Sequence, residues 1–142
     1  MKNEDLYKVR PIKDLRDMLY SSVELYGEKA AFLSKPKGQA DYAAITYKQY
    51  KSGVEAFGTA LISLGLKDGK IALIGENRYE WSISYLAIVN GTSVIVPLDK
   101  ELPPNEIELL LERSKADAII YSGKVKDKIE ILTKKETSLR YF

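Results

Sequence analysis

The chain has 142 residues, which is enough for one domain with its own hydrophobic core. Its 22 basic and 20 acidic residues are interspersed and give a net charge of +2, which excludes the basic surface of a typical nucleic-acid-binding protein. Because the chain contains no cysteine and no histidine, thiol nucleophiles, disulfides, imidazole bases and the preferred zinc ligands are excluded as well.

The sequence shows neither a membrane span nor a secretory signal. Its longest apolar runs are far shorter than the roughly 20 residues that cross a bilayer. Glu4 and Asp5 stand near the N-terminus, where a signal peptide would become apolar. We therefore expect a cytoplasmic location.

The first half of the chain predicts two helices separated by a β-hairpin. The expected ranges are 15–26 for the first helix, 30–33 and 42–45 for the strands, and 46–64 for the second helix. Gly27 should end the first helix. Thr46 and Gln49 match a capping box at the start of the second helix, and Gly65 is a natural left-handed end for it.

The second half alternates apolar runs with helix-like segments, which predicts three parallel strands joined by crossover helices. The expected strands are 70–75, 93–97 and 117–121; helices should follow Asn77, Pro103 and Val125. Asn77 is expected to cap its helix with Glu80 at the third helical position. The last residues, 138–142, resemble the opening of another strand, which favours a truncated chain over a terminus docked on the fold.

Four acids surround the predicted carboxyl ends of the strands, where open parallel sheets bind ligands. They are Glu76, Glu80, Asp99 and Glu101. Paired carboxylates could serve acid–base chemistry or hold magnesium. Surface acids in loops are the commoner case, and Glu80 already has a capping role, so we favour a structural interpretation.

Basic and aromatic residues near the same edge also have two interpretations. Arg78 at the first turn of a helix could meet an anion, but we favour Trp81 on the apolar face and Arg78 in solvent. The strand, turn and helix start at 121–128 carries three lysines and could hold a phosphate. A solvated basic helix face is the favoured alternative. The segment 65–70 lacks the length and strand–helix context of a phosphate-binding P-loop.

Several segments, taken in order, carry a family resemblance. They are the first helix, Ile45–Tyr47, Leu64–Ala72, Glu76–Trp81, Gly91, Val96–Leu98, Leu102–Glu106 and Ser114–Asp117. Their order and spacing resemble the N-terminal region of the long-chain acyl-CoA synthetases, which are adenylate-forming, AMP-binding enzymes. The resemblance implies an α/β fold with a parallel sheet, crossover helices and an N-terminal β-hairpin. Residues 1–142 would then be an incomplete first part of the large N-terminal domain.

The resemblance also implies a function for a longer parent protein. Family members activate a carboxylate with Mg²⁺ and ATP to an acyl-adenylate, then transfer the acyl group to coenzyme A; a long-chain fatty acid would be the substrate here. The family's phosphate loop, its Tyr-Gly-x-Thr-Glu motif, its ribose-binding Asp and its adenylation Lys have no counterpart in this chain. The chain alone is thus expected to be inactive, to lack catalytic and metal-binding residues, and to bind no cofactor tightly.

The resemblance suggests further contacts. In some relatives the coenzyme A nucleotide lies near the turn after the third strand, which makes Gly123, Lys126 and Lys128 candidate phosphate contacts. The remainder of the parent chain would be the natural partner of this segment, and the parent could lie at a membrane surface. Sheet edges and helix faces left uncovered should make the isolated segment self-associate.

Two other classes of function remain open. One is a stand-alone binding or regulatory module with a flavodoxin-like sheet, although Ser122-Gly123 stands where a receiver-type site needs Asp. The other is a different adenylate-forming enzyme, such as an aryl-CoA ligase or a peptide-synthetase adenylation domain. The sequence contains no carboxylate pocket, so it does not identify the acyl group.

Overall fold

The computed structural model describes residues 9–35, 38, 40–91, 93–132 and 139–142. The strands form two sheets: an antiparallel hairpin of β1 (Ala30–Ser34) and β2 (Ala43–Thr46), and a parallel sheet of β3 (Lys70–Ile74), β4 (Val94–Leu98) and β5 (Ala118–Tyr121). The parallel sheet has the order β4-β3-β5. The predicted hairpin and the three parallel strands with crossovers are confirmed.

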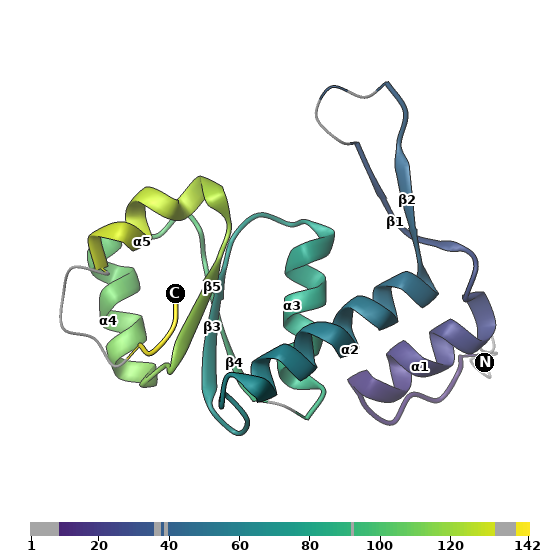
Figure 1. The fold of residues 1–142 in the computed structure, drawn as a ribbon, viewed down its shortest axis with the longest axis horizontal. Helices are drawn as coiled ribbons and strands as arrows, with labels where there is room; N and C mark the ends of the chain where they lie inside the picture. The colour runs from purple at the N-terminus through teal and green to yellow at the C-terminus, as the bar shows by residue number, and fades with distance from the viewer. Residues whose placement is uncertain (1–8, 36–37, 39, 92, 133–138) are drawn as a thin grey trace, which may run out of the picture.

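Helices cover both faces of the parallel sheet (Figure 1). The helices are α1 (Leu15–Tyr26), α2 (Tyr47–Ser63), α3 (Tyr79–Val89), α4 (Pro104–Ser114) and α5 (Lys126–Leu132), with a 3₁₀ turn η1 (Gly123–Val125) before α5. In the view of Figure 1, α1, α2 and α3 lie on one side of the sheet and α4 and α5 on the other, while the hairpin projects from the body. This is the three-layer arrangement expected of alternating strands and helices.

The boundaries of α2 follow the local chemistry of the sequence. The Thr46 hydroxyl accepts from the Gln49 amide at 3.2 Å, and the Thr46 amide donates to the Gln49 side chain at 2.9 Å, which confirms the predicted capping box. At the other end Gly65 has φ +71°, and the amides of Gly65 and Leu66 donate to the carbonyls of Ile62 and Leu61. This is a Schellman ending, which glycine adopts without steric cost.

The predicted cap of α3 is wrong by one residue. Arg78, not Asn77, occupies the N-cap with extended backbone angles, and it makes no side-chain cap hydrogen bond. Glu80 therefore falls at the second helical position rather than the third. The Glu80 carboxylate accepts two hydrogen bonds from Arg78 across the first turn instead of capping the helix.

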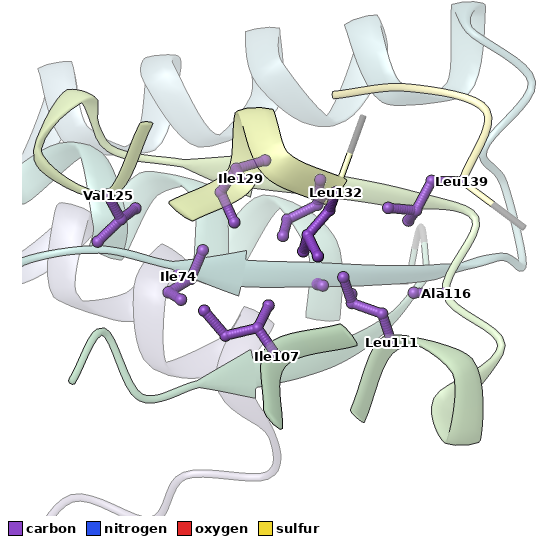
Figure 2. Close-up of a cluster of buried hydrophobic side chains, with 10 residues drawn as sticks. Ile74, Ile107, Leu111, Ala116, Val125, Ile129, Leu132 and Leu139 are labelled. Atoms are coloured by element: carbon purple, nitrogen blue, oxygen red, sulfur yellow. The ribbon is translucent and has the colours of Figure 1, made fainter. Parts of the chain in front are cut away.

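The core has one cluster on each face of the sheet and a third among the helices α1, α2 and α3. On the sheet, one cluster joins Ala72 and Ile74 to α4, α5 and η1 (Figure 2), and another joins Ile71 and Ala118 to α2 and α3. Ile74 is completely buried, as is Ile71 from the opposite face. Each strand of this sheet thus contributes apolar side chains to both layers, which is why its strands appear as continuous apolar runs in the sequence.

The last residues of the chain lie beside β5. Tyr141 forms a parallel bridge with Ala118, and the Ile119 amide donates to the Tyr141 carbonyl at 3.1 Å. The Tyr141 hydroxyl donates to the Leu64 carbonyl at 2.9 Å, so the same residue also reaches the end of α2. The strand-like pairing predicted for this segment is present at Tyr141; Ser138 lies outside the described residues. The connection between the two predicted hairpin strands is described only at positions 34, 35, 38, 40 and 41.

Candidate functional site at the carboxyl edge of the parallel sheet

The carboxyl ends of β3 and β5 diverge. The chain leaves β3 toward α3 on one face of the sheet and leaves β5 toward α5 on the other (Figure 1). The order β4-β3-β5 corresponds to 2-1-3, the order of the first three strands of flavodoxin-like sheets. Ligands of such sheets bind in the crevice where adjacent strands send their connections in opposite directions, which here lies between the carboxyl ends of β3 and β5.

A crevice of about 160 Å³ occupies this position. Its walls come from the ends of β3 and β5 and from the first turns of α3. The residues that matter for its chemistry are Gly75, Glu76, Trp81, Ser84, Tyr121 and Ser122. Residues that are far apart in the sequence meet here because β3 and β5 are hydrogen-bonded neighbours, with Ile74 opposite Tyr121.

Glu76 is the most perturbed titratable group of the crevice. The nearby Ser122 hydroxyl, followed by the backbone amide of Glu76 itself, lowers the pKa of its carboxyl to about 2, so the group is ionised at neutral pH. Oε1 of Glu76 lies 3.3 Å from the Lys124 ammonium. Oε2 is buried and, within the described part of the chain, has no partner of normal hydrogen-bond geometry.

Ser122 faces Glu76 from the neighbouring strand. Its hydroxyl is also buried without a well-formed hydrogen bond to any described residue. Gly75 permits this close approach, because a β-carbon at position 75 would lie only 3.0 Å from the Ser122 β-carbon. Both groups are thus shielded from solvent, and their interaction is what lowers the pKa of the Glu76 carboxyl.

The other three acids at this edge have structural roles in ion pairs and a turn. Glu80 accepts two hydrogen bonds from Arg78, at 2.7 and 3.1 Å. Glu101 pairs with Lys100, and the Asp99 carboxylate accepts the Glu101 amide at 2.9 Å in a turn. Among the described residues, no group of three or more acids, histidines or cysteines is placed to hold a metal ion. The four acids therefore do not form one cluster, and only Glu76 points to chemistry.

Trp81 and Arg78 have separate roles. Trp81 is half-buried, stacks on Tyr85 with ring centroids 5.4 Å apart, and also forms part of the crevice wall. Arg78 is exposed and paired with Glu80. The favoured packing interpretation of Trp81 is thus only part of its role, because one surface of the ring is available to the crevice.

The structure brings Gly123, Lys126 and Lys128 to the same edge of the sheet, on η1 and α5. Gly123 is exposed and borders the crevice. The Lys126 ammonium lies 3.3 Å from Glu130. The Lys128 ammonium donates to the carbonyls of Lys100 and Leu102 at 2.7 and 2.9 Å, and so ties α5 to the loop after β4.

Sequence reasoning missed Ser122 as a site residue. A signal was available in the sequence: Gly75 ends one predicted parallel strand and Ser122 follows another, so neighbouring strands would place the two residues close together. How closely the Glu76 and Ser122 side chains approach each other depends on backbone positions that the sequence pattern does not specify.

Comparison with known proteins identifies the family. The profile of the AMP-binding enzyme family matches residues 19–140. The chain belongs to this family. It is 36% identical over 92 residues to "Fatty acyl-CoA synthetase A" of Dictyostelium discoideum, covering 64% of the chain and 14% of that protein. It is 30% identical over 124 residues to "Long-chain-fatty-acid–CoA ligase 5" of Rattus norvegicus, covering 84% of the chain and 18% of that protein.

The fold is similar to that of a solved family member. The long-chain-fatty-acid-CoA ligase FadD1 of Archaeoglobus fulgidus matches 94% of the chain with a TM-score of 0.79 and 17% identity. The match spans 27% of that protein. The predicted fold, the first part of the N-terminal domain of an adenylate-forming enzyme, is confirmed. The AMP-binding chain therefore spans less than a third of each of these relatives.

Proposed function

We propose that this AMP-binding chain is the first part of a ligase that activates a long-chain fatty acid with ATP and Mg²⁺ and transfers the acyl group to coenzyme A. The supporting observation is the family match over residues 19–140 combined with a curated relative, named as a long-chain fatty acid ligase, that aligns with 84% of the chain. Residues 1–142 would then be an incomplete AMP-binding domain, and its first partner would be the remainder of the same polypeptide.

The isolated chain should be inactive. At the carboxyl edge, the charged groups of Arg78, Glu80, Lys100 and Glu101 neutralise one another in ion pairs. The family's motifs for phosphate, adenine, magnesium and ribose have no counterpart in the sequence. ATP, Mg²⁺ and the fatty acid would therefore be held by the rest of the parent protein.

Contact with a coenzyme A phosphate at Gly123, Lys126 and Lys128 is part of this proposal. Gly123 leaves room for a close approach, since no described atom lies within 4 Å of a β-carbon placed there. Lys126 is exposed and held by one ion pair. Lys128 has three N–H donors, two of which are used by backbone carbonyls, so one remains for a phosphate oxygen.

The location and assembly of the protein are further parts of the proposal. Within the described ranges, no helix has the length and apolarity that crossing a membrane requires. We place the parent in the cytoplasm, at a membrane surface where long-chain fatty acids partition.

The isolated chain should self-associate through uncovered apolar residues such as Val94 on β4 and Ile131 on α5, which are 56% and 51% exposed. Size-exclusion chromatography with light scattering tests this, and a clean monomer at high concentration contradicts it.

Two experiments test the main proposal. An immunoblot of source-cell lysate against residues 99–114 should show a band several times larger than this chain; a band of its own size favours a free-standing flavodoxin-like module. ATP–pyrophosphate exchange by the full-length parent across a panel of carboxylic acids should then be strongest with long-chain fatty acids. Exchange with aryl acids or amino acids alone would favour an aryl-CoA ligase or a peptide-synthetase adenylation domain.

A further inference from the structure

Glu76 connects the segment after β3 to the turn after β5. Its carboxylate is shielded from solvent at Oε2, and the Ser122 hydroxyl beside it is buried as well. An ionised carboxylate can only accept hydrogen bonds, so the hydroxyl is the donor between them. Oε1 of the same carboxylate lies 3.3 Å from the Lys124 ammonium. One side chain from the first connection thus holds two residues of the neighbouring one.

The residues on both sides of this contact are suited to it. Ser122 occupies the N-cap of η1, where a serine hydroxyl commonly caps the turn, yet it makes no side-chain cap hydrogen bond. Its hydroxyl interacts with Glu76 instead. A β-carbon at Gly75 would lie 3.0 Å from the Ser122 β-carbon, so a larger residue there would crowd the two chain segments apart.

The turn η1 determines where α5 begins. Val125 is 4% exposed and packs in the cluster with α4 and α5 (Figure 2). Its amide donates to the Ser122 carbonyl at 3.1 Å, and the Lys126 amide donates to the Gly123 carbonyl. Further along, Lys128 donates to carbonyls of the loop after β4. Contacts with two different connections therefore hold the segment 122–128 near both of its ends.

This short segment has one buried and two exposed positions that depend on its orientation. Val125 faces the core, whereas Gly123 and Lys126 are exposed. Because η1 leads directly into α5, a rotation of the turn would move all three positions together. Glu76 lies outside the segment and restrains the turn from the β3 side.

We propose that Glu76 is a positioning residue, which fixes the turn after β5 so that Gly123 and Lys126 face a phosphate of coenzyme A. This role rests on the proposed function, which places coenzyme A at the turn. Glu76 itself does not touch the ligand, because Ser122 and Lys124 engage its two carboxylate oxygens. It acts through the orientation of the backbone.

Hydrogen–deuterium exchange of the 142-residue chain tests whether Glu76 fixes the turn. E76A removes the carboxylate, and S122A removes only its hydroxyl donor, which keeps the test valid should E76A fail to fold. In both variants the amides of Val125 and Lys126 should exchange at least about tenfold faster, as expected when one charge-assisted hydrogen bond is lost. The amides of α2 should keep their wild-type rates. E28A removes an ion-paired acid between α1 and β1 and should change neither set.

Kinetics of the full-length parent test whether the turn serves coenzyme A. ATP–pyrophosphate exchange with a fatty acid takes place without coenzyme A, so E76A and S122A should exchange at the wild-type rate. Their KM for coenzyme A should rise by about tenfold, the same loss expressed as binding. The double variant E76A/S122A should have no higher KM than either single variant, because both changes remove one contact.

The outcomes separate this proposal from the ligase assignment. Wild-type exchange at Val125 and Lys126 in folded E76A and S122A would overturn the role of Glu76. Faster deuterium exchange with an unchanged KM for coenzyme A would overturn it as well, because the turn would then present nothing to the ligand. A wild-type parent that shows no pyrophosphate exchange with any fatty acid contradicts the ligase assignment instead, and the deuterium exchange rates still decide whether Glu76 fixes the turn.

Discussion

Lys128 offers a quantitative test of how the carboxyl edge is held together. Its ammonium donates to the carbonyls of Lys100 and Leu102, and thereby joins α5 to the loop between β4 and α4. Replacing it with methionine keeps most of the aliphatic stem and removes both charge-assisted hydrogen bonds. Such bonds contribute about 1.5 to 3 kcal/mol each when buried.

The expected loss for K128M is smaller than that sum. The bond to Lys100 is exposed and the bond to Leu102 is only partly buried, so water can replace much of both. We expect a total loss of about 1 to 2 kcal/mol in the free energy of unfolding. For a domain of this size the corresponding fall in Tm is roughly 3 to 6 °C.

Urea unfolding and calorimetry of K128M measure this loss, and K126M is the matched control. Lys126 lies on the same helix but makes an exposed i,i+4 ion pair with Glu130, worth less than about 0.5 kcal/mol. Equal destabilisation of K128M and K126M would refute the reasoning. In the full-length parent, if Lys128 contacts a coenzyme A phosphate, K128M should raise the KM for coenzyme A more than the KM for dephospho-coenzyme A, whereas loss of a purely structural role would affect both alike.

Three further predictions concern the helix cap, the core and the crevice. T46A should lose about 1 kcal/mol of unfolding free energy in urea titrations, because it removes one half of the capping box; an unchanged midpoint would contradict the assigned cap. I74A should lose about 3 kcal/mol, since Ile74 is fully buried between β3 and the α4–α5 layer, and a loss below about 1 kcal/mol would mean that this layer is loosely packed. The pKa of Glu76 is lowered from 4.5 to about 2, so its ionised form stabilises the fold above about pH 4.5, and that stability is lost as the pH falls toward 2. The stability difference between wild type and E76Q, measured by urea unfolding at successive pH values, should therefore shrink over that window; a constant difference would contradict the assigned pKa.

Elements with strong local signals were predictable from the sequence. The capping box at Thr46 and the left-handed glycine at Gly65 involve residues only a few positions apart, so local composition determines them. The three parallel strands were equally predictable, because both faces of the sheet are covered and each strand is a continuous apolar run.

The features that the sequence did not predict depend on competing local interactions or on contacts between residues that are far apart in the chain. Asn77 is a good cap by composition, but Arg78 occupies the N-cap of α3 and its side chain pairs with Glu80. Lys128 donates to carbonyls that lie 26 and 28 positions earlier in the chain. No sequence pattern predicts such a contact between a side chain and a distant loop. The facing of Glu76 and Ser122 depends in the same way on the register between β3 and β5.

The docking of Arg140 and Tyr141 has a practical consequence for recombinant expression. Arg140 donates to the Gly65 carbonyl at 3.3 Å and Tyr141 to the Leu64 carbonyl at 2.9 Å, so the final residues complete the end of a helix made much earlier in the chain. A shortened version that stops at Leu132 would expose that helix end, the edge of β5 and the pocket filled by Leu139. Boundaries chosen for soluble production should therefore keep residues 139–142, and any affinity tag is better attached ahead of α1.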